Sequence, residues 1–200
     1  EWPYVRINLG SSQGAEHQGT LARVAGELSE LAPQAGRSGV TLLVENCGDF
    51  VTSRDLWFLV DAVGHPAVRI CWNPLNGMLR GENPTISIPR LARWLSVFRL
   101  ADGSFDEQGR FAGYRLPGEG DVNVARAIDL LKGVCYQGWL IFEWPKMIAD
   151  LPEPAEALPK VVTYARRRLA DVQPALSAYK GDKHPTRFEA PPAVEATSGP

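Results

Sequence analysis

The segment of residues 39–46 is the strongest constraint on the fold of this 200-residue chain. Residues 40–44 are apolar or β-branched without interruption, and Glu45 and Asn46 follow directly. Such a run is typical of a strand buried on both faces, as in a parallel sheet covered by helices. In α/β proteins the functional groups gather at the carboxyl ends of these strands. Glu45 therefore stands where a catalytic or metal-binding carboxylate is expected, although capping a turn or pairing with a cation fits it equally well.

Strands and helices alternate along the rest of the chain. Apolar runs predict strands at residues 4–10, 67–73, 97–102 and 139–143. Apolar residues at three- and four-residue spacing predict helices at residues 15–35, 52–63, 88–95, 121–131 and 154–169. Thr52 and Asp121 are the expected caps of two of these helices. The alternation of five strands with helices predicts an α/β fold with a parallel sheet or barrel.

Two segments are predicted to lack regular structure. Residues 103–120 are rich in glycine and polar residues, which indicates a long loop of the kind that is usually functional or disordered. From residue 173 onward the chain is rich in proline, alanine and charged residues without periodicity. We therefore expect a folded domain over residues 1–172 and a mobile tail over residues 173–200.

Composition excludes several classes of function. A net charge of −2 offers no general attraction to nucleic acid or to an anionic membrane, so neither is an expected partner. No apolar run approaches the ~20 residues of a membrane span, and no signal peptide opens the chain, which favours a cytoplasmic location. Cys47, Cys71 and Cys135 form no metal-binding spacing, and each is expected to be a buried free thiol.

Three stretches resemble the xylose isomerase-like TIM-barrel family of sugar isomerases and epimerases, which also contains endonuclease IV-type DNA repair enzymes. Residues 39–46 (GVTLLVEN) are similar to the family's fifth strand, and residues 136–143 (YQGWLIFE) to its eighth strand. Between them, residues 116–121 (LPGEGD) are similar to a family loop that precedes a helix. The resemblance covers about residues 4–168 and implies a partial (β/α)₈ TIM barrel made of parallel strands four to eight with surrounding helices.

A barrel that lacks its first three β/α units has two open sheet edges. Either the chain is a piece of a longer protein, or a partner completes the barrel. The first residue, Glu1, is not a methionine, which favours the first alternative.

The resemblance also implies a site for a divalent ion, and this sequence departs from it. Family members hold the ion with a Glu, an Asp, a His and a second Glu at the ends of strands five to eight. Glu45 and Glu143 occupy the two Glu positions, whereas Asn73 replaces the Asp and Arg99 replaces the His. Hard ions such as Mg²⁺ and Mn²⁺ prefer anionic oxygen, and a protonated guanidinium donates no lone pair. We therefore expect no metal cofactor, or Mn²⁺ or Mg²⁺ if the family site still functions.

Arg99 is the residue on which this departure depends. Placed between Glu45 and Glu143, its fixed charge replaces that of the ion and satisfies both carboxylates. The alternative is that a shift in register turns Arg99 toward a surrounding helix or solvent.

The resemblance implies an isomerase or epimerase acting on a small sugar or sugar phosphate, with Glu45 and Glu143 as catalytic residues and as metal ligands if an ion is bound. Expected substrate-binding residues follow the other strands: Asn73, Asn76, Arg99, Asp102 and Glu119, the last of which alternatively orders its loop. The loss of two ligands leaves weak activity or inactivity as outcomes. The alternative function is a non-catalytic carbohydrate-binding or scaffold domain that retains the fold.

Overall fold

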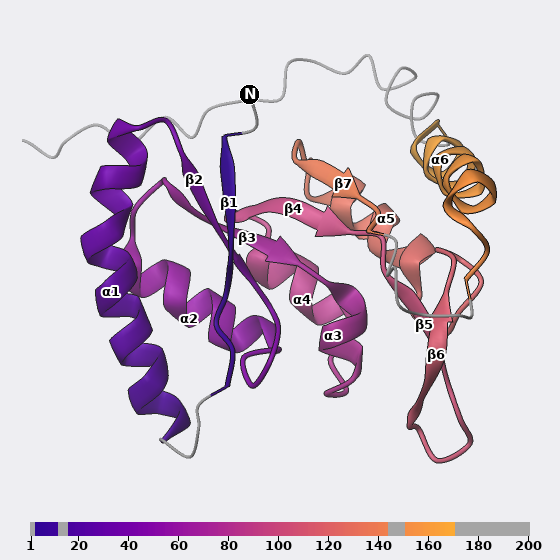
Figure 1. Ribbon diagram of the computed structural model, residues 1–200, viewed down its shortest axis with the longest axis horizontal. Helices are drawn as coiled ribbons and strands as arrows, with labels where there is room; N and C mark the ends of the chain where they lie inside the picture. Colours follow the sequence, from indigo (N-terminus) through magenta and orange to yellow (C-terminus); the bar gives the residue numbers. More distant parts are fainter. Residues whose placement is uncertain (1–2, 12–15, 144–150, 171–200) are drawn as a thin grey trace, which may run out of the picture.

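A computed structural model of the chain describes residues 3–11, 16–143 and 151–170 (Figure 1). Its centre is a five-stranded sheet in the order β1-β2-β3-β4-β7, in which all neighbouring strands are parallel. The strands are β1 (Tyr4–Asn8), β2 (Thr41–Glu45), β3 (Val68–Trp72), β4 (Leu95–Arg99) and β7 (Trp139–Ile141). The predicted parallel sheet is therefore confirmed, and the expected tail over residues 173–200 lies outside the described residues.

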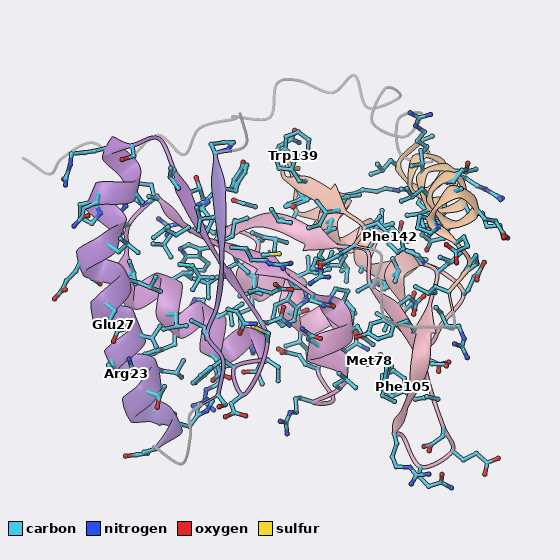
Figure 2. The ribbon with its side chains drawn as sticks, in the orientation of Figure 1. Arg23, Glu27, Met78, Phe105, Trp139 and Phe142 are labelled. Atoms are coloured by element: carbon cyan, nitrogen blue, oxygen red, sulfur yellow. The ribbon has the colours of Figure 1, made fainter. Side chains whose placement is uncertain are left out.

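Helices cover one face of this sheet. They are α1 (His17–Arg37), α2 (Ser53–Val63), α4 (Pro84–Leu91), α5 (Val124–Gly133) and α6 (Pro154–Ala170). Each packs against the next in the series, so the helices follow the same order as the strands they connect. The main hydrophobic core lies between these helices and the sheet (Figure 2). None of the helices in the described ranges has the length and hydropathy that a membrane span requires.

A second, smaller apolar cluster lies on the opposite face of the sheet. It consists of Leu43, Cys71 and Val97, with Tyr4 and Ile141 packed against them. Because β2 has apolar neighbours on both faces, residues 42–45 are all buried, as the unbroken apolar run predicts. Within the described residues β1 and β7 form the two edges of the sheet, whereas a closed barrel of this class has eight strands. The chain is thus a partial TIM barrel.

The helix predicted at residues 88–95 begins earlier than expected. Asn83 caps α4 by accepting a hydrogen bond from the Thr85 N–H, and Pro84 occupies the first turn. Pro89 therefore lies inside the helix and not at its start. A short helix, α3 (Pro74–Met78), follows β3 in the same way, with Asn73 as its cap. Both helices begin at an Asn-Pro pair, the start signal that the apolar periodicity alone does not reveal.

The long loop predicted at residues 103–120 is instead largely an antiparallel hairpin. Its strands are β5 (Asp102–Phe105) and β6 (Phe111–Arg115), and the Phe105 and Phe111 rings meet edge to face. Asp106 organises the turn by accepting hydrogen bonds from the Gln108 and Arg110 N–H groups. Glycine and polar residues lower strand propensity, and the cross-strand pairs that compensate for this are not visible in a local pattern.

Two smaller predictions also need correction. The side chain of Asp121 does not cap α5, because it accepts a hydrogen bond from the Phe105 N–H while Asn123 caps the helix. Thr52, by contrast, caps α2 as predicted. Among the cysteines Cys71 is buried, but Cys47 is half-buried and Cys135 is exposed. Cys135 lies in the turn between α5 and β7, outside the core.

The turn after β2 depends on a close approach of two backbone segments. Gly48 has a φ of +62°, and a Cβ atom there would lie 1.8 Å from the Gly10 carbonyl oxygen. Gly39 has a similar φ of +66°, but nothing lies within 4 Å of its would-be Cβ.

We expect Gly39→Ala to cost about 1 kcal/mol of unfolding free energy, which is the approximate cost of the left-handed conformation for a residue with a Cβ. Gly48→Ala is expected to cost a further 1–3 kcal/mol or so, because the Gly10 carbonyl must also move. Urea unfolding of both variants measures the difference. Equal losses would show that no such close approach exists.

Candidate functional site

Two arginines and two glutamates meet at the carboxyl ends of the strands. Glu45 ends β2, Arg99 ends β4, Glu143 follows β7 and Arg6 projects from β1. Arg99 Nη1 contacts Glu45 Oε1, and Arg99 Nη2 lies 2.5 Å from Glu143 Oε2. The expected bridge from Arg99 to both glutamates is therefore present. These four side chains are called the arginine–glutamate cluster below.

Arg6 is the member of this cluster that the sequence analysis does not include. Its Nε lies 3.3 Å from Glu45 Oε2, and its Nη1 donates a hydrogen bond of 3.0 Å to Glu143 Oε2. In β1 the residue lies two positions before Asn8, which is in register with Glu45. Side chains two positions apart on a strand share a face, so this alternation places Arg6 on the face that carries Glu45. The two-residue alternation along this strand is the sequence signal that could have identified Arg6 as a member of the cluster.

The cluster differs in solvent exposure from one side to the other. The side chain of Glu45 is 6% exposed and that of Arg99 is 17% exposed, whereas those of Arg6 and Glu143 are 47% and 48% exposed. Burial alone raises the pKa of Glu143, but the hydrogen bond from Arg6 and the charge of Arg99 outweigh it and hold the pKa below its ordinary value. The hydrogen bond to Glu143 likewise raises the pKa of Arg6 against partial burial.

The small apolar cluster on this face forms the floor of the site. Cys71 is in register with Glu45, and Val97 lies two positions before Arg99. Burial, with the Glu45 charge as a second cause, raises the pKa of the Cys71 thiol to about 12. The thiol is therefore neutral near neutral pH and serves as an apolar contact rather than as a nucleophile.

Three asparagines fix the ends of β2 and β3 relative to each other. The buried Asn46 accepts a hydrogen bond of 2.6 Å from the Asn73 N–H and donates one of 2.9 Å to the Asn73 carbonyl. Asn76 in turn donates to the Asn46 carbonyl at 2.7 Å. The Asn73 side-chain oxygen accepts from the Leu75 and Asn76 N–H groups as the cap of α3. Asn73 and Asn76 thus line the site, but their side chains bond to the backbone of this strand end.

Asp102 is completely engaged with the main chain. Its Oδ1 accepts from the Gly103 and Val122 N–H groups, and its Oδ2 accepts from those of Gly118 and Gly120, at 2.8–3.0 Å. The residue is 1% exposed, and burial raises its pKa while these four hydrogen bonds oppose the rise.

The motif at residues 116–121 wraps around this carboxylate. A Cβ on Gly120 would lie 2.3 Å from Asp102 Oδ1, so glycine is needed there. The structure therefore gives Asp102 an organising position in this loop. Glu119 lies on the outer side of the same loop, where it is exposed and does not line the site.

The cluster borders a cavity of about 310 Å³. Besides the arginine–glutamate cluster, its charged lining residues are Asp102 and Arg115. The remainder of the lining is uncharged and consists of Asn8, Cys47, Asn73, Asn76, Leu100, Ala101, Tyr114, Phe142 and Leu151. Such a volume and a predominantly polar wall suit a small hydroxylated molecule.

The donor atoms at this site do not fit a hard divalent ion. Both oxygens of Glu45 and Oε2 of Glu143 are contacted by guanidinium nitrogens, and Arg99 stands between the two carboxylates. Over the described ranges, no three His, Cys, Asp or Glu side chains converge to form a possible metal site. A cation placed here would have to displace fixed positive charges.

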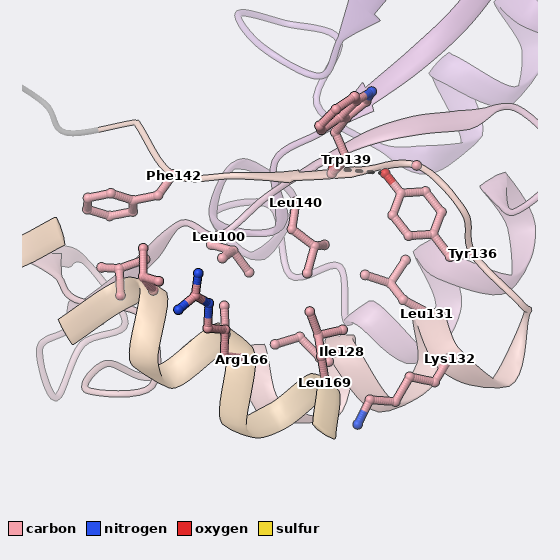
Figure 3. A pocket seen from close by; sticks show the side chains of 14 residues that line it. Leu100, Ile128, Leu131, Lys132, Tyr136, Trp139, Leu140, Phe142, Arg166 and Leu169 are labelled. Carbon is pink, nitrogen blue, oxygen red and sulfur yellow. Dashed lines mark hydrogen bonds between the residues drawn. The ribbon is translucent and has the colours of Figure 1, made fainter. Parts of the chain in front are cut away.

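A second cavity, of about 400 Å³, lies beside β7 and is mainly apolar. Figure 3 shows Leu140 of β7 pointing toward Ile128 and Leu131 of α5, with Leu169 of α6 beside Ile128. The Arg166 guanidinium stands at its side. This groove faces the helices and is separate from the arginine–glutamate cluster.

We expect Asp102→Asn to lower the unfolding free energy by about 2–4 kcal/mol. The amide nitrogen would face two backbone N–H groups that now have a carboxylate acceptor, and each lost acceptor costs about 1–3 kcal/mol. Urea unfolding measures the change. Glu119→Gln, in the same loop but exposed, is the control and should be nearly neutral. An equally small effect at Asp102 would contradict the organising position of its carboxylate.

The lowered pKa of Glu143 makes stability depend on pH in the acidic range. The unfolded chain binds its proton at higher pH than the folded chain, so the stabilisation is present above about pH 4.5 and disappears as the pH falls through the folded value. Because the Glu143 side chain is half exposed, we expect its contribution to the unfolding free energy to be less than ~1 kcal/mol. As the pH is lowered below about 4.5, the unfolding free energy should fall less steeply in Glu143→Gln than in the wild type or in the exposed control Glu107→Gln. Parallel profiles would contradict this.

Comparison with known proteins agrees with this architecture. The chain is similar to the xylose isomerase domain protein of Planctomyces limnophilus, with 19% identity, a TM-score of 0.64 and coverage of 84% of this chain and 60% of that one. An L-ribulose 3-epimerase gives 16% identity, a TM-score of 0.66 and coverage of 86% and 61%. The probable 3-DHS dehydratase of Bacillus anthracis gives 16% identity and a TM-score of 0.65, with coverage of 82% of this chain and 63% of that one. At these identities the likeness shows the fold alone.

The chain spans about three fifths of the length of these solved structures. No curated protein matches its sequence. A family model described as xylose isomerase-like TIM barrel matches residues 3–167, which is most of the chain. The five parallel strands, the helices along one face and this match lead to the same conclusion: the chain belongs to the xylose isomerase-like TIM-barrel family.

Proposed function

We propose that this protein is a sugar or sugar-phosphate isomerase/epimerase homologue whose site holds its sugar without a divalent ion. The observation that carries the proposal is the contact of the Arg99 guanidinium with both Glu45 and Glu143. Arg99 supplies at this position the positive charge that an ion supplies in the site implied by the resemblance. Family membership and the polar cavity of about 310 Å³ support a small sugar as the ligand.

The proposed chemistry is proton transfer beside a carbonyl group. One glutamate removes the proton from the carbon next to the carbonyl, the C–H electron pair forms the C=C bond of an enediolate, and the carbonyl π pair moves onto its oxygen. Return of the proton to the other face of the same carbon gives epimerisation. Return to the former carbonyl carbon, with transfer of the hydroxyl proton between the two oxygens, gives isomerisation. The negative oxygen of the enediolate then lies against Arg99, which stabilises it electrostatically. Glu143 is the better candidate for the base, because one of its oxygens has no arginine contact among the described residues.

The same contacts predict that this chemistry is slow. An efficient general base has a pKa near the working pH and a free lone pair, whereas Glu45 is paired through both oxygens and the pKa of Glu143 is lowered. The pairing of the glutamate oxygens with arginines favours the second candidate function, a carbohydrate-binding or scaffold domain without catalysis. In that case the cluster positions the sugar but moves no proton.

We further propose that additional β/α units complete the barrel, supplied by a polypeptide that pairs with β7 and β1. The described sheet has five strands, and a closed barrel of this class has eight. The apolar groove beside β7 suits the outward side chains of a neighbouring strand (Figure 3). Such closure would also exclude water from the arginine–glutamate cluster.

We expect any aldose–ketose isomerase or epimerase activity to be equally fast in EDTA and in added Mn²⁺, because the positive charge at the site belongs to Arg99. A panel of sugars and sugar phosphates assayed under both conditions measures this. Glu143→Gln should abolish the turnover while sugar binding persists. Binding without turnover in the wild type would favour the second candidate, and turnover restored only by Mn²⁺ would reject the proposal.

Metal titration of a restored site is the matching control. Wild-type protein should bind no stoichiometric Mn²⁺, whereas Asn73→Asp combined with Arg99→His should gain one binding site, with circular dichroism to verify that the variant is folded. Tight stoichiometric Mn²⁺ in the wild type would overturn the replacement of the ion by Arg99. No gain in a folded double variant would contradict the assignment of positions 73 and 99.

A further inference from the structure

Arg115 is a half-buried cation that lines the same cavity from the hairpin. It is the last residue of β6 and is in register with Asp102 of β5. Its Nη1 donates a hydrogen bond of 2.8 Å to the Tyr114 carbonyl, which holds the guanidinium close to its own strand. Across the described ranges, no carboxylate lies within 4.0 Å of this guanidinium. Its Nε and Nη2 edge is therefore available to an acceptor.

The other charges of the cavity are balanced among themselves. The two arginines of the arginine–glutamate cluster are matched by its two glutamates. Asp102 is 1% exposed and directs both oxygens at main-chain N–H groups, so it offers no acceptor surface to a ligand. Among the charged lining residues of the described chain, Arg115 is thus the one that has neither an acid in contact nor its charge enclosed by the main chain.

From these observations we infer that the ligand of this site is a sugar that carries a carboxylate or phosphate group, and that Arg115 binds this anionic group. The inference rests on the proposed function, since it specifies the class of sugar for the same cavity. A guanidinium presents two parallel N–H donors that match the oxygens of a carboxylate or a phosphate. A neutral sugar offers hydroxyl groups alone and leaves the charge of Arg115 uncompensated.

Calorimetric titration of the full chain with three matched probes tests the inference: D-glucose, D-glucuronate and D-glucose 6-phosphate. At low salt we expect at least one anionic probe to bind about tenfold or more tightly than D-glucose, and the stronger of the two identifies the anionic group. Arg115→Gln should abolish the preference for that probe over D-glucose.

Arg110→Gln is the matched control, because it removes the same charge from the same hairpin at an exposed position paired with Asp106. It should retain the preference for the anionic probe, and thermal unfolding verifies that both variants are folded. Equal affinity for all three probes would overturn the inference and leave the proposed function intact. A preference that survives Arg115→Gln would overturn the assignment to Arg115. Failure of all three probes to bind would reject the inference and the proposed function together.

Discussion

The structure of the site depends on the pairing of two arginines with two glutamates where parallel strands end. The charged side chains come from four strands or the residues that follow them, and parallel pairing brings these ends to one edge of the sheet. Glu45 is almost completely buried, so its charge is tolerated because Arg6 and Arg99 each approach one of its oxygens. Removal of either arginine would leave a buried charge without full compensation. The pairing therefore links the strand ends and balances the charges on this side of the cavity.

The apolar floor and the asparagine network support this pairing from below and from the side. Leu43, Cys71 and Val97 fill the face of the sheet beneath the cluster and exclude water from that side. Asn46 connects the ends of β2 and β3 through hydrogen bonds to the backbone of Asn73. Satisfied polar networks of this kind restrict the positions that neighbouring side chains can adopt. Glu45 consequently has little freedom to move away from its arginines, which limits its use as a base.

The hairpin and the glycine loop form the remaining wall of the cavity. Asp102 gathers the backbone of residues 103–122 around one carboxylate, and the loop closes tightly because Gly120 has no Cβ. This closure places β6, and with it Arg115, at the side of the cavity. A segment predicted as a loop thereby supplies the cation to which we assign the anionic group of the ligand.

Local sequence patterns were sufficient to predict the alternation of strands and helices, the parallel sheet, and the placement of Glu45, Arg99 and Glu143 at strand ends. These features follow from local periodicity and from the order of the segments, neither of which depends on how the side chains pack. The same patterns did not reveal that Arg6 joins the cluster, that the Asp102 carboxylate bonds to the loop backbone or that Glu119 lies outside the cavity lining. Each of these depends on contacts between residues far apart in the chain, and a local pattern carries no information about such distances.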